Sequence, residues 1–262
     1  MKVTALNIYP VKSFRGIAVS RSSIDEFGLE RDRRWMLVDG EGKFVSQRRH
    51  PRMALLQAFL SDAGEVCIAV EGNIYSLIPD PGLQVEVTVW SDTCLAWQNA
   101  DPTVDDRISS FLGLQVKLVY MPDDTFRQVD RHYFPGDQRV GFTDGYPILL
   151  LNEASLRDLN RRLPHEVGMD RFRGNIVVDT DLPYVEDDWK KIQIGEVMLA
   201  VVKPCSRCVM TTVDSATGVK GSEPLKTLSG YRKTELGVIF GQNMVQLNAG
   251  VISVGDTVRL VE

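Results

Sequence analysis

Apolar and polar residues alternate through most of the first hundred positions, with the period of two that is typical of β-strands. The chain opens with β-branched and aromatic residues in KVTALNIYPV (2–11), and RWMLVDGEGKFVSQR (34–48) predicts a hairpin that turns at DGEG. The segments EVCIAVEGNIYSLIP (65–79) and QVEVTVWSDTCLAWQN (84–99) repeat this arrangement. Short strands at regular spacing favour a barrel or a sandwich-like sheet for this half of the chain.

Two segments in the middle of the chain have helical features instead. Residues 101–113 (DPTVDDRISSFLG) predict a helix with its apolar side chains on one face, and Asp101 or Thr103 is suited to cap it. Residues 152–162 (NEASLRDLNRR) predict a second helix, which begins with a favourable N-cap, Asn152, and ends in basic residues. The chain is therefore expected to contain a few helices.

Strand patterns return in the last third of the chain. They occur in IQIGEVMLAVV (192–202), CVMTTVD (208–214) and MVQLNAGVISVGDTVRLVE (244–262). Residues 121–145 are polar and rich in turn-forming residues, so they predict a long loop. The whole pattern predicts a β-rich α+β fold.

The composition is that of an ordinary globular protein. The 262 residues are 44% apolar and 25% charged, and this length suits one elaborate domain or two closely packed ones. A formal net charge of −5 gives no reason to expect nucleic acid as a partner, although the basic clusters RDRRW (31–35) and QRRHPR (47–52) leave a small anionic ligand possible. The apolar runs are too short to span a membrane and no secretion signal is visible, so no membrane association is expected. Four cysteines without a disulfide pattern lead us to expect a cytoplasmic location.

Several familiar catalytic motifs do not occur in the sequence. It contains no glycine-rich nucleotide-binding motif, no G-x-S-x-G and no H-E-x-x-H. The three histidines, His50, His132 and His165, are far apart in loop-like sequence. Neither a catalytic triad nor a histidine-rich metal centre is supported.

The segment KPCSRCVMTTVD (203–214) is the strongest local signal for chemistry. A structural zinc site needs about four ligands, but Cys67 and Cys94 lie in separate strand segments and form no second pair. A redox dithiol would open a helix in a β-α-β unit, whereas the residues after Cys208 have a strand pattern. Two half-buried core cysteines remain a further alternative.

A single thiolate ligand fits this segment better. Thiolates bind thiophilic metals, including a metal that an organic cofactor delivers. Lys203 and Arg207 are placed to stabilise a thiolate and to attract an anionic ligand. The local residues do not decide which cysteine is the ligand or which metal it holds.

Ordered blocks along nearly the whole chain carry a family resemblance. The blocks are YPVKSFRG (9–16), GLERDRRWMLVD (28–39), FTDGYPILLLNEASLRDLN (142–160), FRGNIVV (172–178), DDWKKIQIG (187–195), KPCSRCVMTTVD (203–214), EPLKTLSGYR (223–232) and FGQN (240–243). With these blocks the chain resembles the MOSC-domain proteins, and within them the bacterial YcbX-type proteins and the mitochondrial amidoxime-reducing components.

The resemblance implies an architecture and a cofactor. An N-terminal β-barrel-like domain, residues 1–120, would pack on a MOSC β-barrel domain, residues 121–262. A molybdenum cofactor, molybdenum bound to molybdopterin, would lie between them. Cys208 would be the metal ligand, and Cys205 would be its neighbour. Pyridoxal phosphate binding is an attribute of the superfamily only.

The resemblance also assigns site residues one at a time. The implied cofactor-binding positions are Lys12, Ser13, Arg33, Asp144, Arg173, Asn175, Ser206, Arg207, Cys208, Gln242 and Asn243. Lys12 and Ser13 would hold the phosphate, Arg33 would contact phosphate or pterin, and the donors of Arg173 and Asn175 suit the polar edge of a pterin.

Two of these positions would also serve catalysis. Cys208 would act as metal ligand, and Asp144 would lie close to the metal and assist proton delivery.

Lys12 and Arg33 would be taken for surface residues without the resemblance. The chain departs from the family at Gly174, where relatives carry proline, and this change suggests a looser backbone.

The implied activity is the reduction of N-hydroxylated compounds such as amidoximes, hydroxylamines and N-hydroxylated bases. The oxygen atom would be abstracted at a cysteine-ligated molybdenum. The clustered cysteines of a ferredoxin-like domain are not evident in this sequence. The electrons would come either from a separate flavoprotein, ferredoxin-like protein or cytochrome, or from such a domain in a longer natural chain. The alternative is a module that carries the cofactor or its sulfur without turnover of its own.

Overall fold

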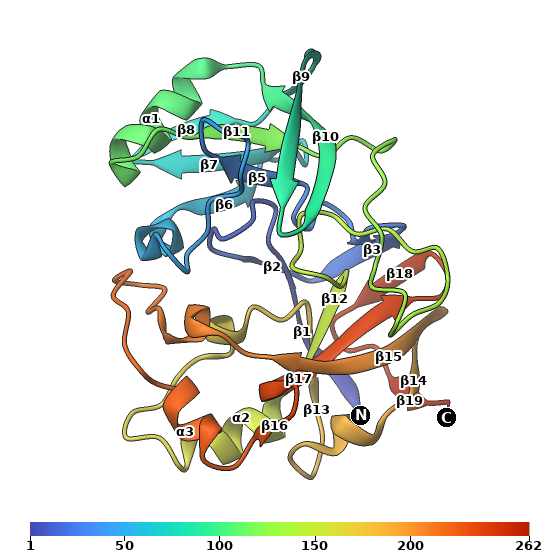
Figure 1. The fold of residues 1–262 in the computed structure, drawn as a ribbon. Coiled ribbons are helices and arrows are strands. Elements are labelled where there is room, and N and C mark those ends of the chain that lie inside the picture. The colour runs from blue at the N-terminus through green and yellow to red at the C-terminus, as the bar shows by residue number, and fades with distance from the viewer. Residues whose placement is uncertain (262) are drawn as a thin grey trace.

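One large sheet combines strands from both ends of the chain. Its members are β1 (Lys2–Ile8), β2 (Ile17–Val19), β12 (Ile148–Asn152), β13 (Ile176–Asp179), β14 (Lys191–Ile194), β15 (Val197–Ser206), β16 (Lys233–Thr234), β17 (Gly237–Gln246) and β19 (Val258–Leu260). In the computed structural model, which describes residues 1–261, this 9-stranded sheet has the order β19-β14-β15-β17-β12-β13-β1-β2, with β16 paired to β17 (Figure 1). β12 and β13 run parallel, and β1 pairs antiparallel with β13. The N-terminal strand is therefore part of the sheet that the C-terminal half builds.

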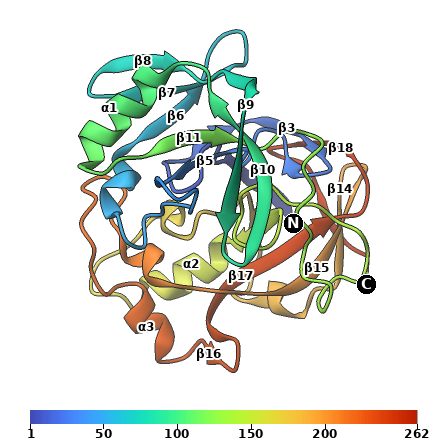
Figure 2. The same ribbon diagram turned by 45° about the horizontal axis from the view of Figure 1, so that its top comes forward.

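Three smaller sheets complete the β-structure. One contains β5 (Trp35–Val38), β9 (Pro79–Val89), β10 (Asp92–Asn99) and β11 (Lys117–Tyr120); the second contains β6 (Gln57–Leu60), β7 (Val66–Val70) and β8 (Asn73–Ser76); the third contains β3 (Arg21–Asp25), β4 (Gly28–Leu29) and β18 (Gly250–Ser253). The first two sheets and the helix α1 (Pro102–Leu112) gather at one end of the molecule (Figures 1 and 2). They form the β-rich N-terminal half that was expected.

The helices are few and short. Besides α1 they are α2 (Glu153–Asn160) and α3 (Leu225–Ser229), with single 3₁₀ turns η1 (Pro51–Leu55), η2 (Met169–Phe172), η3 (Val185–Asp188) and η4 (Val209–Thr212). Both predicted helices are confirmed together with their caps, because the Asp101 side chain accepts from the Thr103 amide and Asn152 accepts from the Ala154 amide. In residues 1–261 no helix is long and apolar enough to cross a membrane.

Two hydrophobic clusters show where each half has its core. One lies on the large sheet and includes Leu6, Leu150 and Ile192. The other lies in the N-terminal half and includes Phe14 and Trp35. Since each half buries apolar side chains of its own, polar residues can line the junction between them without disrupting either core.

Most strand predictions are confirmed, one is confirmed only in part and one is wrong. The hairpins β7–β8 and β9–β10 are present, and residues 121–145 hold no regular strand or helix. The return arm of the hairpin that starts with β5 is reduced to an isolated bridge between Val38 and Phe44. The segment after Cys208 is not a strand but the 3₁₀ turn η4, and α3 was not predicted. The β-branched residues of η4 were misleading because tertiary contacts overrode their propensity.

Candidate functional site

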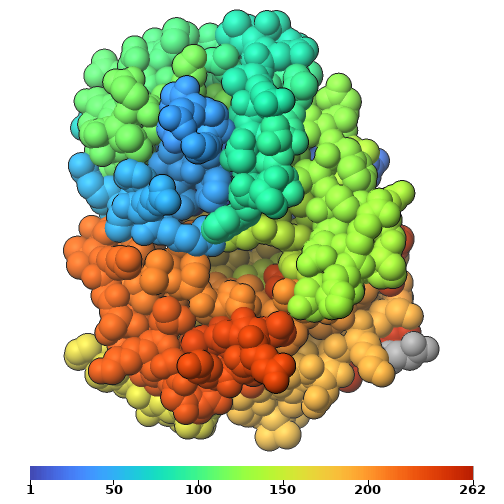
Figure 3. Space-filling view, in the orientation of Figure 1, coloured from blue at the N-terminus to red at the C-terminus, as the bar shows by residue number. Residues whose placement is uncertain are grey.

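A cavity of about 410 Å³ lies at the junction of the two halves. Figure 3 shows the surface hollowed where the tip of the β9–β10 hairpin, the 121–145 loop and the orange segment near residue 205 meet. It is lined by Lys12, Ser13, Arg33, Arg48, Trp90, Thr143, Asp144, Gly145, Tyr146, Leu149, Phe172, Arg173, Asn175, Cys205, Ser206, Arg207, Cys208, Met210, Thr211 and Asn243. Ten of the eleven cofactor-binding positions that the family resemblance implies are in this set, so the fold brings them together.

Lys12 enters the cavity from a tight turn after β1. Its backbone amide donates to the Trp35 carbonyl at 2.7 Å, and the next residue, Ser13, has a left-handed φ of 68°. Residue Lys12 is only 5% exposed. Its ammonium donates to the Phe142 carbonyl at 2.7 Å and to the Asp144 carboxylate at 2.6 Å. Burial lowers the pKa of Lys12 to about 8, although Asp144 opposes the shift. Lys12 is thus a buried, paired ammonium and not the solvated lysine that local sequence suggested.

Asp144 receives three donors at the mouth of the cavity. Lys12 and Arg48 both pair with its carboxylate, and the Trp90 indole N–H donates at 3.3 Å. Burial would raise the pKa of Asp144, but the charges of Lys12 and Arg48 outweigh it and hold this pKa far below its usual range. Asp144 is therefore a carboxylate at neutral pH.

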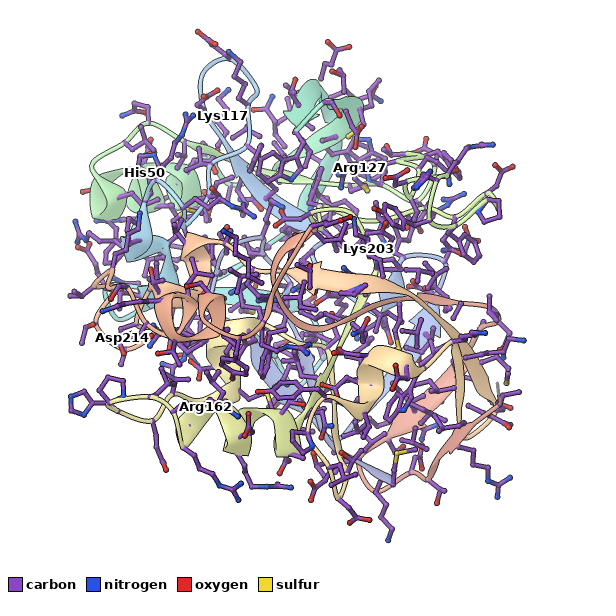
Figure 4. The ribbon with its side chains drawn as sticks, turned by 60° about the horizontal axis from the view of Figure 1, so that its bottom comes forward. His50, Lys117, Arg127, Arg162, Lys203 and Asp214 are labelled. Carbon is purple, nitrogen blue, oxygen red and sulfur yellow. The ribbon has the colours of Figure 1, made fainter. Side chains whose placement is uncertain are left out.

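The loop that carries Asp144 is held by a buried arginine, Arg127 (Figure 4). Its guanidinium donates to the carbonyls of Gly141 and Thr143 at 2.9 and 2.7 Å and pairs with Asp92 at 2.7 Å. Because these contacts fix the backbone on one side of Asp144, an irregular loop can hold a site residue in a definite place.

Arg48 and Trp90 are site residues that the motif analysis missed. Arg48 stacks over the Trp90 ring at 4.7 Å. Burial disfavours its charge, yet Asp144 and the Cys208 thiol beside it raise the pKa of Arg48. The basic cluster QRRHPR, which indicated a small anionic ligand, was the signal for Arg48, whereas no local pattern pointed to Trp90.

Arg33, Arg173 and Asn175 form the inner wall. The Arg33 guanidinium donates to Asn175 Oδ1 and to the Arg173 carbonyl, both at 3.1 Å, and pairs with buried Asp32. Arg33 and Arg173 lie over the Tyr9 ring at 4.5 and 4.3 Å. Burial, and then the charge of Arg33, lowers the pKa of Arg173 to about 10. The inner wall therefore concentrates positive charge.

The two cysteines of the C-x-x-C differ in their surroundings. Cys205 lies in β15 and accepts from Arg207 at 2.9 Å, while Cys208 lies two residues beyond the end of β15, directly before η4, and faces Arg48. In residues 1–261 no three His, Cys, Asp or Glu side chains cluster as a metal site would require. A single cysteine ligand is consistent with this arrangement.

Two residues do not lie where sequence reasoning put them. Gln242 is buried but donates to Asp187 at 2.7 Å and is absent from the cavity lining, while its neighbour Asn243 is present. Adjacent strand residues point to opposite faces, which separates these two side chains. Lys203 lies over the Tyr133 ring at 3.9 Å, as part of the junction between β15 and the loop (Figure 4), and does not line the cavity.

The chain matches two family models in tandem. Residues 1–115 match the MOSC N-terminal beta barrel domain, and residues 137–259 match the MOSC domain. It is 35% identical to mitochondrial amidoxime-reducing component 1 of Homo sapiens, over 99% of this chain and 82% of that protein. The chain belongs to the MOSC family. The expected pairing of a MOSC N-terminal domain with a MOSC domain is confirmed, while the boundary at residue 120 stays a prediction.

Further relatives of this MOSC protein extend the comparison. It is 30% identical to mitochondrial amidoxime reducing component 2 of Homo sapiens, over 98% of this chain and 82% of that protein. It is 29% identical to molybdenum cofactor sulfurase of Arabidopsis thaliana, over 90% of this chain and 32% of that protein. Among solved structures, YiiM from Geobacillus stearothermophilus aligns with 45% of this chain and 55% of its own at a TM-score of 0.35 and 19% identity.

The residues present fit a molybdopterin-type cofactor. The lining includes five cationic side chains, Lys12, Arg33, Arg48, Arg173 and Arg207, and one carboxylate, Asp144. Four lining residues bury a polar atom without a hydrogen-bond partner: Arg48 Nη1, Thr143 Oγ1, Tyr146 Oη and Arg207 Nε. Buried polar groups normally have partners, so these atoms indicate a polar, anionic ligand.

Proposed function

We propose that this MOSC protein is a molybdenum cofactor-dependent reductase of N-hydroxylated compounds. The observation that carries the proposal is the free thiol of Cys208 beside Arg48, in a cation-lined cavity where four buried polar atoms lack hydrogen-bond partners. The names of the amidoxime-reducing relatives support the same activity. With the cofactor bound, molybdenum would supply the two-electron chemistry that removes oxygen from an N–O bond.

The residues of the chain would bind and orient. Lys12, Ser13 and Arg33 would hold the phosphate, because a dianion matches a buried ammonium, a hydroxyl and a guanidinium. Arg173 and Asn175 would orient the pterin edge. Ser206, Arg207 and Asn243 would complete the wall, and Cys208 would coordinate the metal.

The negative charge of Asp144 determines the role that we assign to it. Conversion of an amidoxime to an amidine consumes two electrons and two protons and releases water. A carboxylate whose pKa is held this low is a poor proton donor at neutral pH. We therefore assign Asp144 to accept a hydrogen bond from the amino group of the substrate, which would orient the N–O bond. The electrons would come from a separate flavoprotein, ferredoxin-like protein or cytochrome.

Metal and pterin content test the proposal directly. Wild-type protein, Cys208→Ser and the matched control Cys205→Ser would be purified from cells that make molybdenum cofactor. About one molybdenum and one pterin per chain are expected for wild type and for Cys205→Ser, with loss of metal and of benzamidoxime reduction in Cys208→Ser. Wild-type turnover in Cys208→Ser would contradict the ligand assignment.

A carrier function is the competing outcome. It would appear as cofactor that exchanges readily from wild-type protein, with no reduction of benzamidoxime by a chemical electron donor. Stoichiometric cofactor that stays bound through gel filtration, together with reductase activity, would exclude the carrier and support the enzyme.

A further inference from the structure

A second cavity, of about 480 Å³, adjoins the cofactor cavity. It lies between the segment 47–54 of the N-terminal half and the segments around α2, η2 and residue 213 of the C-terminal half. Figure 4 labels His50 and Asp214, which belong to the two segments that flank it. Arg173 and Met210 are common to the linings of both cavities. Its volume is within the range of small-molecule sites, about 300–1,000 Å³.

An unpaired amide lines this cavity. Gln47 is only 5% exposed, and its side chain has no hydrogen-bond partner within residues 1–261. Neither of its amide atoms is among the fully buried polar atoms without a partner in residues 1–261, so the amide is open to the cavity. A ligand there would find both a free donor and a free acceptor in this side chain.

An unpaired cation lies in the same lining. The Arg15 guanidinium has no acidic partner in the described chain, although its backbone is anchored by a 2.9 Å hydrogen bond to the Leu56 carbonyl. The neighbouring Arg157 and Arg171 are compensated, by Asp179 at 2.7 Å and by Asp214 at 3.7 Å. Arg15 is exposed, and it contributes a solvated positive charge that no carboxylate of residues 1–261 pairs with.

The remaining walls are mixed. Leu156, Met169, Met210 and Val213 line the cavity beside the Tyr9 ring. Two carboxylates also line it, Glu153, which pairs with Arg157 at 3.7 Å, and Asp170, which accepts from the Ser215 hydroxyl. A flat hydrocarbon body would pack between the apolar side chains while its charged end reached Arg15 and Gln47.

We propose that this second cavity is a binding site for a small organic anion with an apolar body, held by an ion pair to Arg15 and a hydrogen bond to Gln47. This proposal does not depend on the reductase function, because neither of the two polar anchors, Arg15 and Gln47, lines the cofactor cavity. Arg173 and Met210, which line both cavities, are the residues through which occupation of one would affect the other.

Calorimetric titration with naphthalene-2-carboxylate tests the site on purified protein. One binding event per chain is expected for wild type. Arg15→Ala should weaken it by about tenfold or more and Gln47→Leu by about two- to tenfold. Arg107→Ala, an exposed arginine on α1 outside both linings, is the matched control and should bind as wild type does.

Three results would overturn the proposal. The first is no binding to wild type at about 1 mM probe, a concentration that detects interactions of about 4 kcal/mol. The second is equal affinity for the uncharged naphthalene-2-carboxamide, which would remove the role of Arg15. The third is loss of binding in Lys12→Met with retention in Arg15→Ala, which would place the probe in the cofactor cavity.

Discussion

The contact between Lys12 and Asp144 offers a quantitative test of how the site is held together. The Lys12 side chain is 6% exposed and the Asp144 side chain 49% exposed. Removing one partner of a fully buried pair costs about 3–5 kcal/mol, whereas an exposed pair contributes about 0–1 kcal/mol. Asp144→Ala leaves the buried ammonium of Lys12 with a carbonyl and no counter-charge. We expect a loss of about 2 kcal/mol, between these limits, which corresponds to a fall in Tm of about 4–8 °C.

The companion variant decides whether the cause is the unpaired charge. Lys12→Met leaves Asp144 with Arg48 and solvent, so its expected cost is below about 1 kcal/mol. The double variant Asp144→Ala/Lys12→Met buries no unpaired ammonium and should be more stable than Asp144→Ala alone. Urea unfolding would be measured on protein from a host without molybdenum cofactor, since bound cofactor adds stability of its own. Additive losses in the double variant would refute the reasoning.

Three further predictions follow from buried charge and close packing. Burial lowers the pKa of Lys12 from 10.5 to about 8, so between pH 8 and 10.5 the unfolded chain binds more protons than the folded chain. The free energy of unfolding of wild type should therefore rise over this pH range. The urea midpoint of Lys12→Met should rise less than that of wild type. Burial raises the pKa of Asp105 from 3.8 to about 6, so its contribution to stability should fall as pH rises through that range; Asp105→Asn keeps the acceptor for the Leu118 amide and should flatten this part of the urea profile. A Cβ at Gly174 would lie 2.3 Å from the buried Leu151 side chain, so Gly174→Ala should cost about 1–3 kcal/mol, whereas the open control Gly40→Ala should stay within about 0.5 kcal/mol; equal melting temperatures for the two would contradict the packing argument.

The close approach at Gly174 also revises an expectation from the sequence. Glycine in place of the family's proline suggested a looser backbone. In the structure Gly174 is buried, and its carbonyl accepts from the Tyr9 hydroxyl at 3.2 Å. Glycine is present because Leu151 occupies the space that a side chain would need. The absence of a Cβ here reflects tight packing, which a single sequence cannot reveal.

The local sequence was sufficient to predict those helices and hairpins whose capping residues or alternating pattern lie within the element itself. The caps Asp101 and Asn152 defined where α1 and α2 begin, and alternating residues marked the hairpins β7–β8 and β9–β10. These features depend on neighbouring residues, whose hydrogen bonds and side-chain period act over a few positions. The segment after Cys208 failed the same reasoning because its contacts are non-local.

Only the tertiary structure decided how the site is assembled. Motifs and family resemblance identified Lys12, Asp144 and Cys208. They did not show that Arg48 contacts both Asp144 and Cys208, or that the Trp90 indole donates to Asp144. Nor did they show that Gln242 turns away, or that a second cavity adjoins the first. Such facts follow from the packing of segments that are far apart in the sequence, by 54 positions for Trp90 and Asp144 and by 132 for Lys12 and Asp144, and burial there sets the charge state of each group. The sequence by itself determined the residues and the local elements; long-range packing determined their distances, their partners and their pKa values.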